Sequence, residues 1–122
     1  MDISFPNSHK SIPKRIHSIL NRIDPSKLIC AHMGGYNYLD DVEKYLMESG
    51  VLIDTSFCIG KFDTNQIKRI INNFNPDNIL FGTDSPWDSQ KNALNNFLSL
   101  NINNNTAEKI LYKNAQRILH SD

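Results

Sequence analysis

Three residues that could do chemistry interrupt or close apolar runs of strand length: His32, Asp54 and Asp84. A carboxylate and an imidazole at strand ends can together ligate a divalent metal, or one can bind the metal while the other moves a proton. An Asp after a strand can also cap a turn or a helix, and a His beside Gly-Gly can simply hydrogen-bond a loop. The residue types alone therefore leave both catalytic and structural roles open.

The spacing of the apolar residues predicts short strands that alternate with amphipathic helices. The predicted strands cover 28–32, 51–57 and 79–83. The predicted helices cover 13–23, about 39–49, an amphipathic stretch from a capping box at Asp63 and Gln66 to Phe74, a segment around 93–98, and a last helix from Thr106. Strands separated by helices of this length are typical of a parallel sheet. The sequence therefore predicts an α/β fold.

The parallel sheet determines where the three polar residues lie, because all its strands end at one edge. Active sites of α/β proteins are built at that edge. Side chains alternate along a strand, so Leu28 and Cys30 should share a side with His32, and Leu80 should share a side with Asp84. We therefore expect His32 and Asp84 to converge on one pocket.

Composition excludes several classes of protein. The chain of 122 residues holds 13 Lys and Arg against 13 Asp and Glu, which leaves no electrostatic footprint for nucleic acid or an anionic membrane. Cys30 and Cys58 are too few for a disulfide framework and lack the spacing of a structural zinc site. No apolar run approaches the roughly 18 residues of a membrane span. We expect one cytoplasmic domain, residues 1–122, for which small-molecule chemistry and protein contact both stay open.

Four short motifs resemble one known family. AHMGG at 31–35, DTS at 54–56, FGTDSPW at 81–87 and KNAQRIL at 113–119 follow the order and spacing of the amidohydrolase-related superfamily of metal-dependent hydrolases. The branch they resemble most also contains decarboxylases of the aminocarboxymuconate-semialdehyde type. The resemblance implies a TIM (β/α)₈ barrel with a divalent metal, usually zinc, at the rim formed by the carboxyl ends of the strands.

The resemblance also implies roles for three residues. Asp84 matches the acid at the end of the eighth strand, which contacts the metal or its bound water. His32 matches the sixth-strand histidine, which donates or accepts a proton near the substrate. Trp87 either contacts the substrate or anchors a packed loop.

The chain departs from the family by matching only strands six to eight, whereas a complete barrel has about 250 residues. The metal ligands of strands one and five have no counterpart, and His9, His17 and His120 do not replace them. We therefore expect the carboxyl-terminal part of a hydrolase, with weak or absent zinc binding and no activity by itself. A decarboxylase and a non-catalytic α/β half-barrel module are the alternatives.

An unfinished barrel also exposes strand edges. The outer strands 28–32 and 79–83 carry no Lys or Pro to block pairing at their edges, and the former barrel side, including Leu28, Cys30 and Leu80, loses its cover. The sequence therefore predicts self-association, pairing with a missing N-terminal half-barrel, or aggregation.

Overall fold

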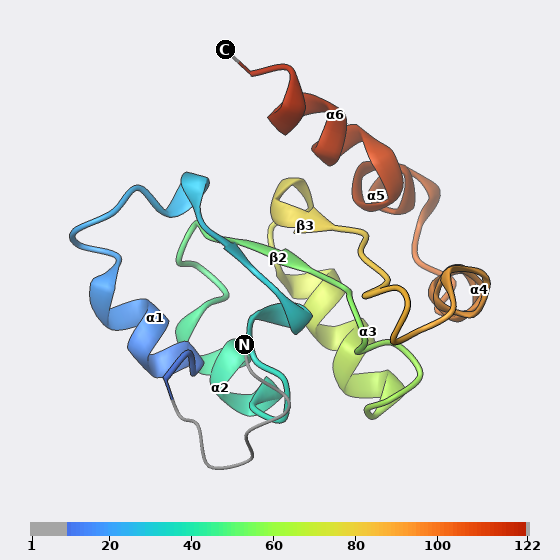
Figure 1. The fold of residues 1–122 in the computed structure, drawn as a ribbon, viewed down its shortest axis with the longest axis horizontal. Coiled ribbons are helices and arrows are strands. Elements are labelled where there is room, and N and C mark those ends of the chain that lie inside the picture. Colours follow the sequence, from blue (N-terminus) through green and yellow to red (C-terminus); the bar gives the residue numbers. More distant parts are fainter. Residues whose placement is uncertain (1–9, 122) are drawn as a thin grey trace.

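The computed structural model describes residues 10–121 and contains a parallel sheet of three short strands. The strands are β1 (Ile29–Cys30), β2 (Leu52–Asp54) and β3 (Ile79–Leu80), in the order β1-β2-β3. The predicted parallel α/β arrangement is confirmed, although each strand is shorter than its apolar run. Figure 1 shows the sheet at the centre of the fold, with β1 on the side of α1 and β3 on the side of α5 and α6.

Helices and tight turns connect and flank the strands. The α-helices are α1 (Pro13–Ile19), α2 (Leu39–Tyr45), α3 (Thr64–Asn73), α4 (Gln90–Ser99), α5 (Asn104–Glu108) and α6 (Asn114–Leu119). Three 3₁₀ turns, η1 (Pro25–Lys27), η2 (His32–Gly34) and η3 (Pro76–Asn78), and one π-helical turn, η4 (Lys109–Lys113), complete the order. No helix within residues 10–121 has the length and apolar character needed to cross a membrane.

Side-chain caps set several of the helix starts. Asp63 accepts the backbone N–H of Gln66 at 2.8 Å and begins α3, as the sequence predicts. The Gln66 side chain does not return the bond to Asp63, because it donates to Asp40 at 2.7 Å. Asn103 caps α5 by accepting the N–H of Thr106 at 2.9 Å, so the last helical segment begins two residues before the predicted Thr106.

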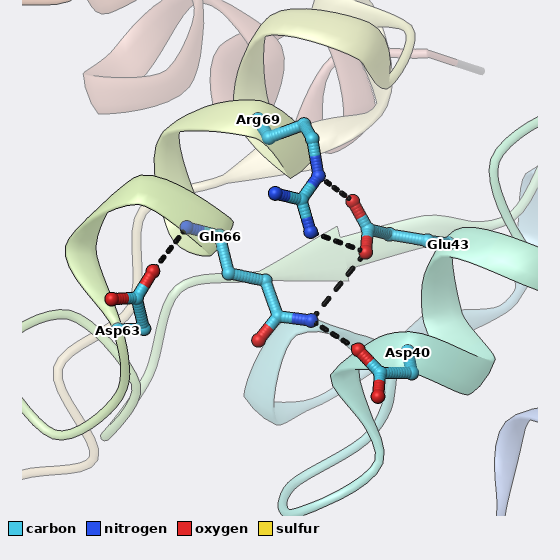
Figure 2. A network of polar contacts seen from close by, with 5 residues as sticks. All are labelled: Asp40, Glu43, Asp63, Gln66 and Arg69. Atoms are coloured by element: carbon cyan, nitrogen blue, oxygen red, sulfur yellow. Dashed lines mark hydrogen bonds and ion pairs between the residues drawn. The ribbon is translucent and has the colours of Figure 1, made fainter.

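A polar network joins α2 to α3 on the outside of the fold (Figure 2). Arg69 donates from Nε and from one terminal nitrogen to the two carboxylate oxygens of Glu43, at 2.6 and 2.9 Å. The hydrogen bonds from Arg69 lower the pKa of Glu43, and Gln66 adds a weaker bond at 3.4 Å. This fork links the two helices through a pair of charge-assisted hydrogen bonds.

The core lies on one face of the sheet. Cys30 pairs with Ile53, and Ile53 pairs with Ile79, so the three side chains stand next to one another and pack into the helices. Ile29 projects from the opposite face and is 50% exposed. The prediction that Cys30 lies on the uncovered side with Leu80 is therefore wrong, because the register puts Ile29 there instead.

The two edges of the sheet differ. On the outer side of β3, the N–H of Phe81 donates to the carbonyl of Ile110 at 2.9 Å, and Nδ2 of Asn114 donates to the carbonyl of Ile79 at 2.7 Å. The π-helical turn accompanies this contact, since the N–H of Asn114 bonds Lys109, five residues back. The prediction of two open edges is therefore wrong for β3, whose edge the chain itself covers.

The outer edge of β1 lacks such a cover within the described residues. The carbonyl of Leu28 accepts the N–H of Leu52 at 2.9 Å, so the alternating backbone groups of Ile29 point away from β2. β1 is the end strand of the sheet, and residues 10–121 supply no further strand beside it.

Candidate active site at the carboxyl edge of the sheet

The parallel strands bring three of the polar segments to one edge of the sheet. His32 follows β1 by two residues, Asp54 is the last residue of β2, and Asp84 follows β3 by four residues. His32 and Asp84 thus leave the sheet at the same edge, where sites of α/β proteins are built. A pocket shared by the two side chains remains a prediction.

Asp54 links the segments at this edge through several hydrogen bonds. Its Oδ1 accepts the backbone N–H of His32 at 3.0 Å and that of Ser56 at 2.9 Å. The same oxygen accepts a very short hydrogen bond from the Ser56 hydroxyl. In the sequence, Asp54 stands out as a polar residue in an apolar run and as part of the DTS motif, but neither feature predicts this role. It joins the segment after β1 to the segment after β2.

The backbone at His32 explains why its side chain departs from the alternation of the strand. His32 and Met33 have φ values of 58° and 57°, in the left-handed region that L residues rarely adopt. The chain therefore turns at His32, and the prediction that its side chain follows Cys30 is wrong. Such strain persists only where surrounding contacts hold it, and the bond from the His32 N–H to Asp54 is one of them.

The imidazole of His32 is buried against the segment after β2. Only 7% of the residue is exposed. Its Nδ1 lies 2.9 Å from the backbone carbonyl oxygen of Ser56 and 3.2 Å from the Ser56 hydroxyl. The ring of Tyr36 meets the imidazole edge-on, with 5.9 Å between centroids. These contacts hold the ring in one orientation.

Thr55 and Gly82 bring the segment after β3 close to this cluster. The Thr55 hydroxyl lies 3.1 Å from both the carbonyl oxygen and the nitrogen of Gly82, donating to the first and accepting from the second. A Cβ on Gly82 would lie 3.3 Å from Cβ of Ser56 and 3.5 Å from Cγ of Asp54. The absence of a side chain at Gly82 therefore lets the strand that leads to Asp84 pass close to Asp54.

Asp84 occupies the turn that follows. Its φ is 59°, and its carbonyl accepts the N–H of Trp87 at 2.8 Å across the cis Ser85–Pro86 bond. The half-buried carboxylate has no hydrogen-bond or ion-pair partner among residues 10–121. Trp87 is 77% exposed, so it is not a packed anchor for the loop, and its contact with substrate stays a prediction.

The other histidines do not join the cluster. His17 lies in α1, where its Nδ1 is 2.9 Å from the carbonyl oxygen of Tyr45 and its ring packs near that residue. His120 is exposed at the end of α6, and His9 lies outside the described residues.

The described residues do not fit a complete metal centre. No three His, Cys, Asp or Glu side chains within residues 10–121 are grouped closely enough to hold an ion, whereas a catalytic zinc has three protein ligands. Oδ1 of Asp54 is already occupied by three donors. Burial raises the pKa of the Cys30 thiol to about 11 and that of the Cys58 thiol to about 12. The role of Asp84 as a metal ligand stays a prediction.

Comparison with known proteins establishes the family. Residues 16–120 match the family model described as amidohydrolase, so the chain belongs to the amidohydrolase family. This finding confirms the resemblance drawn from the four motifs. A comparison with curated proteins finds no match.

Three solved structures share the fold. A 2,6-dihydroxybenzoate decarboxylase complexed with 2,6-dihydroxybenzoate matches with a TM-score of 0.60 and 23% identity, over 87% of this chain and 41% of that one. The 2,6-dihydroxybenzoate decarboxylase from Rhizobium matches with a TM-score of 0.56 and 21% identity, over 87% and 41%. A dihydroxybenzoic acid decarboxylase from Polaromonas sp. JS666, with bound manganese and the inhibitor 2-nitroresorcinol, gives 0.57 and 21%, over 87% and 40%.

The chain thus spans about two-fifths of the length of these structures. At this level of identity the likeness shows the fold alone. It supports an α/β arrangement that resembles part of an amidohydrolase-type barrel and contains a parallel sheet of three strands.

Proposed function

We propose that this chain supplies the carboxyl-terminal part of the active site of a metal-dependent enzyme that acts on a small organic substrate. In this proposal β1, β2 and β3 are strands six to eight of the barrel. Asp84 contributes one metal ligand, His32 moves a proton at the substrate, and Trp87 contacts the substrate. The observation that carries the proposal is the position of the unpartnered Asp84 carboxylate at the same edge of the sheet as the fixed His32 imidazole.

The family supports hydrolysis as the first candidate reaction, and the structural neighbours support a second. All three of the neighbours described above are decarboxylases of dihydroxybenzoates, and one of them holds manganese. Loss of CO₂ from an aromatic acid leaves a carbon that must take up a proton. A histidine at the position of His32 suits that step as well as it suits proton transfer in hydrolysis.

The remaining ligands must come from outside the described residues. We propose that an N-terminal half-barrel provides them, since the neighbours extend well beyond the part that this chain matches. Zinc and manganese are both candidates for the metal. A reducing, cytoplasmic compartment belongs to the same proposal, because Cys30 and Cys58 are buried free thiols.

Turnover by an assembled barrel tests this proposal. The full chain would be joined to the segment of the Rhizobium decarboxylase that it does not cover, which this proposal takes to be N-terminal, and loaded with manganese or zinc. CO₂ release from 2,6-dihydroxybenzoate and hydrolysis of aryl esters and amides would be measured for wild type, His32→Asn and Asp84→Asn. Asp88→Asn is the control, because Asp88 is a neighbouring carboxylate that faces Lys61 at 4.0 Å.

We expect one of the two reactions in the wild type and in the control. Loss of the His32 imidazole should lower kcat by about 10²- to 10⁴-fold, the usual contribution of a general acid or base. A folded, metal-loaded assembly in which His32→Asn turns over as fast as wild type would contradict the role of His32. An assembly without either activity would favour the non-catalytic module.

A further inference from the structure

The hydrogen bonds around Asp54 determine which atom donates in each contact. Oδ1 of Asp54 accepts two backbone N–H groups, from His32 and from Ser56, so that oxygen cannot itself carry a proton toward Ser56. The short contact between the Ser56 hydroxyl and the same Oδ1 must therefore have Ser56 as its donor. This conclusion holds whether or not the other carboxylate oxygen is protonated.

The direction of that bond leaves His32 with one tautomer. A serine hydroxyl has a single hydrogen, and Asp54 already receives the hydrogen of Ser56. Nδ1 of His32 then faces two acceptors, the Ser56 carbonyl oxygen at 2.9 Å and the Ser56 hydroxyl oxygen at 3.2 Å. Both contacts are favourable only when Nδ1 carries the proton.

We infer that Asp54 and Ser56 are positioning residues: the Ser56 carbonyl oxygen holds His32 as the Nδ1–H tautomer, Asp54 keeps the Ser56 hydroxyl from donating to Nδ1, and Nε2 is thereby reserved as the lone-pair nitrogen. The inference rests on the proposed function for its purpose, because it names the atom of His32 that would accept a proton or face the substrate. The other ring nitrogen of a working histidine is often fixed by a backbone carbonyl or a carboxylate in this way.

Nε2 is also the ring nitrogen that the described residues leave without a hydrogen-bond partner. It has no hydrogen-bond partner among residues 10–121, whereas every fully buried side-chain nitrogen or oxygen in that part of the chain has one. The residue as a whole is 7% exposed. The ring is anchored through one nitrogen and open at the other.

A purely local turn does not account for the cluster. The bond from the Ser56 N–H to Asp54 spans two residues and is an ordinary turn at a strand end. The contacts of His32 span 22 and 24 residues and join two different strands. A turn that only ended β2 would need neither of them.

Nitrogen NMR of the histidine side chains tests the inference on the whole chain. The chain would be labelled with ¹⁵N-histidine and measured near pH 8, where an unperturbed imidazole is neutral, with the His32 signals assigned by His32→Gln. We expect the His32 spectrum to show protonated Nδ1 and unprotonated Nε2. A wild-type chain with protonated Nε2 would overturn the inference without any variant.

Two variants and their combination test the roles of Asp54 and Ser56. Asp54→Ala releases the Ser56 hydroxyl, which can then donate to Nδ1, so we expect the Nε2–H form to appear. Ser56→Ala alone keeps the carbonyl contact and should keep Nδ1–H. Asp54→Ala/Ser56→Ala lacks the competing donor and should restore Nδ1–H. Ser49→Ala is the control, because that hydroxyl bonds only nearby backbone, donating to the carbonyl of Leu46 at 2.7 Å and accepting the N–H of Val51 at 3.4 Å.

The outcomes separate this inference from the proposed function. Folded Asp54→Ala with unchanged Nδ1–H would show that Asp54 does not control the tautomer, and would overturn its positioning role. Failure of the double variant to restore Nδ1–H would overturn the role of Ser56. An inactive assembled barrel whose His32 is nevertheless Nδ1–H would contradict the proposed function and leave the tautomer inference intact.

Discussion

The backbone N–H of His32 donates to Oδ1 of Asp54 at 3.0 Å, across two neighbouring strands. Because the same oxygen takes the N–H and the hydroxyl of Ser56, one carboxylate orders the ends of β1 and β2 together. The candidate site therefore depends on Asp54, which bonds the backbone of His32 and also bonds Ser56, the residue that contacts the imidazole.

Removal of the Asp54 carboxylate should destabilise the fold. Asp54→Ala leaves two backbone N–H groups without their acceptor and removes a contact that holds His32 at a φ of 58°. We expect a loss of about 1 to 3 kcal/mol in the free energy of unfolding, the usual cost of unsatisfied buried donors. Urea denaturation would measure it, with Glu48→Ala, at an exposed position, as the comparison. A loss no larger than about 0.5 kcal/mol, the usual limit for surface changes, would show that Asp54 does not order this edge.

Among side chains, that of Asn114 should contribute most to stabilising the outer edge of β3. It is 2% exposed and donates to the carbonyls of Pro76 and Ile79 at 2.8 and 2.7 Å. Asn114→Ala should cost about 1 to 3 kcal/mol in urea denaturation, because two carbonyls lose their donor. Asn95→Ala, at an exposed position of α4, should stay within about 0.5 kcal/mol of wild type. Equal stabilities of the two variants would contradict the cover described for this edge.

The fold shows which features the sequence can and cannot reveal. The alternation of helices and strands predicts a parallel sheet, and the strand ends place His32 and Asp84 at one edge. The alternation of side chains predicts the wrong face of the sheet for Cys30, because in a strand of two residues the register with β2 determines which face each side chain occupies. Alternation also does not predict the direction of the His32 side chain, because the backbone enters the left-handed region at that residue.

The spacing of residues in the sequence does not predict the contacts of two further residues, Asp54 and Asn114. Asp54 is visible as a polar residue in an apolar run, yet its partner His32 lies 22 residues away and is found only once the strands are in register. Asn114 lies among other polar residues in a helical segment. Its role as a cap for β3 depends on a contact that spans 35 residues.

The Glu43–Arg69 pair should make stability depend on pH. Hydrogen bonds from Arg69 lower the pKa of Glu43 below its ordinary value of 4.5 in the folded chain. The unfolded chain therefore takes up this proton first, and the stabilisation is present above pH 4.5 and lost as the pH falls through the lowered value. Wild type should exceed Glu43→Gln in thermal stability at pH 7, with the difference shrinking toward pH 3. A difference that grows as the pH falls would contradict this sign.

The open edge of β1 should make the isolated chain associate with itself. Ile29 is 50% exposed beside a strand edge that residues 10–121 leave uncovered. A charge at such an edge opposes strand pairing, so Ile29→Lys should reduce association in sedimentation velocity at micromolar concentration. Leu119→Lys changes a residue that is 80% exposed on α6, and should associate like wild type. A monodisperse wild-type monomer would contradict the prediction.

We propose that this chain holds part of a metal site, with Asp84 as one ligand, that an N-terminal half-barrel completes. Calorimetric titration with manganese and with zinc tests this proposal, on the chain alone and on the chain joined to the uncovered segment of the Rhizobium decarboxylase. We predict weak or no binding to the chain alone, and one tightly bound ion per joined protein that Asp84→Asn abolishes and Asp88→Asn retains. Tight stoichiometric binding to the isolated chain, or binding to the joined protein that survives Asp84→Asn, would contradict the claim.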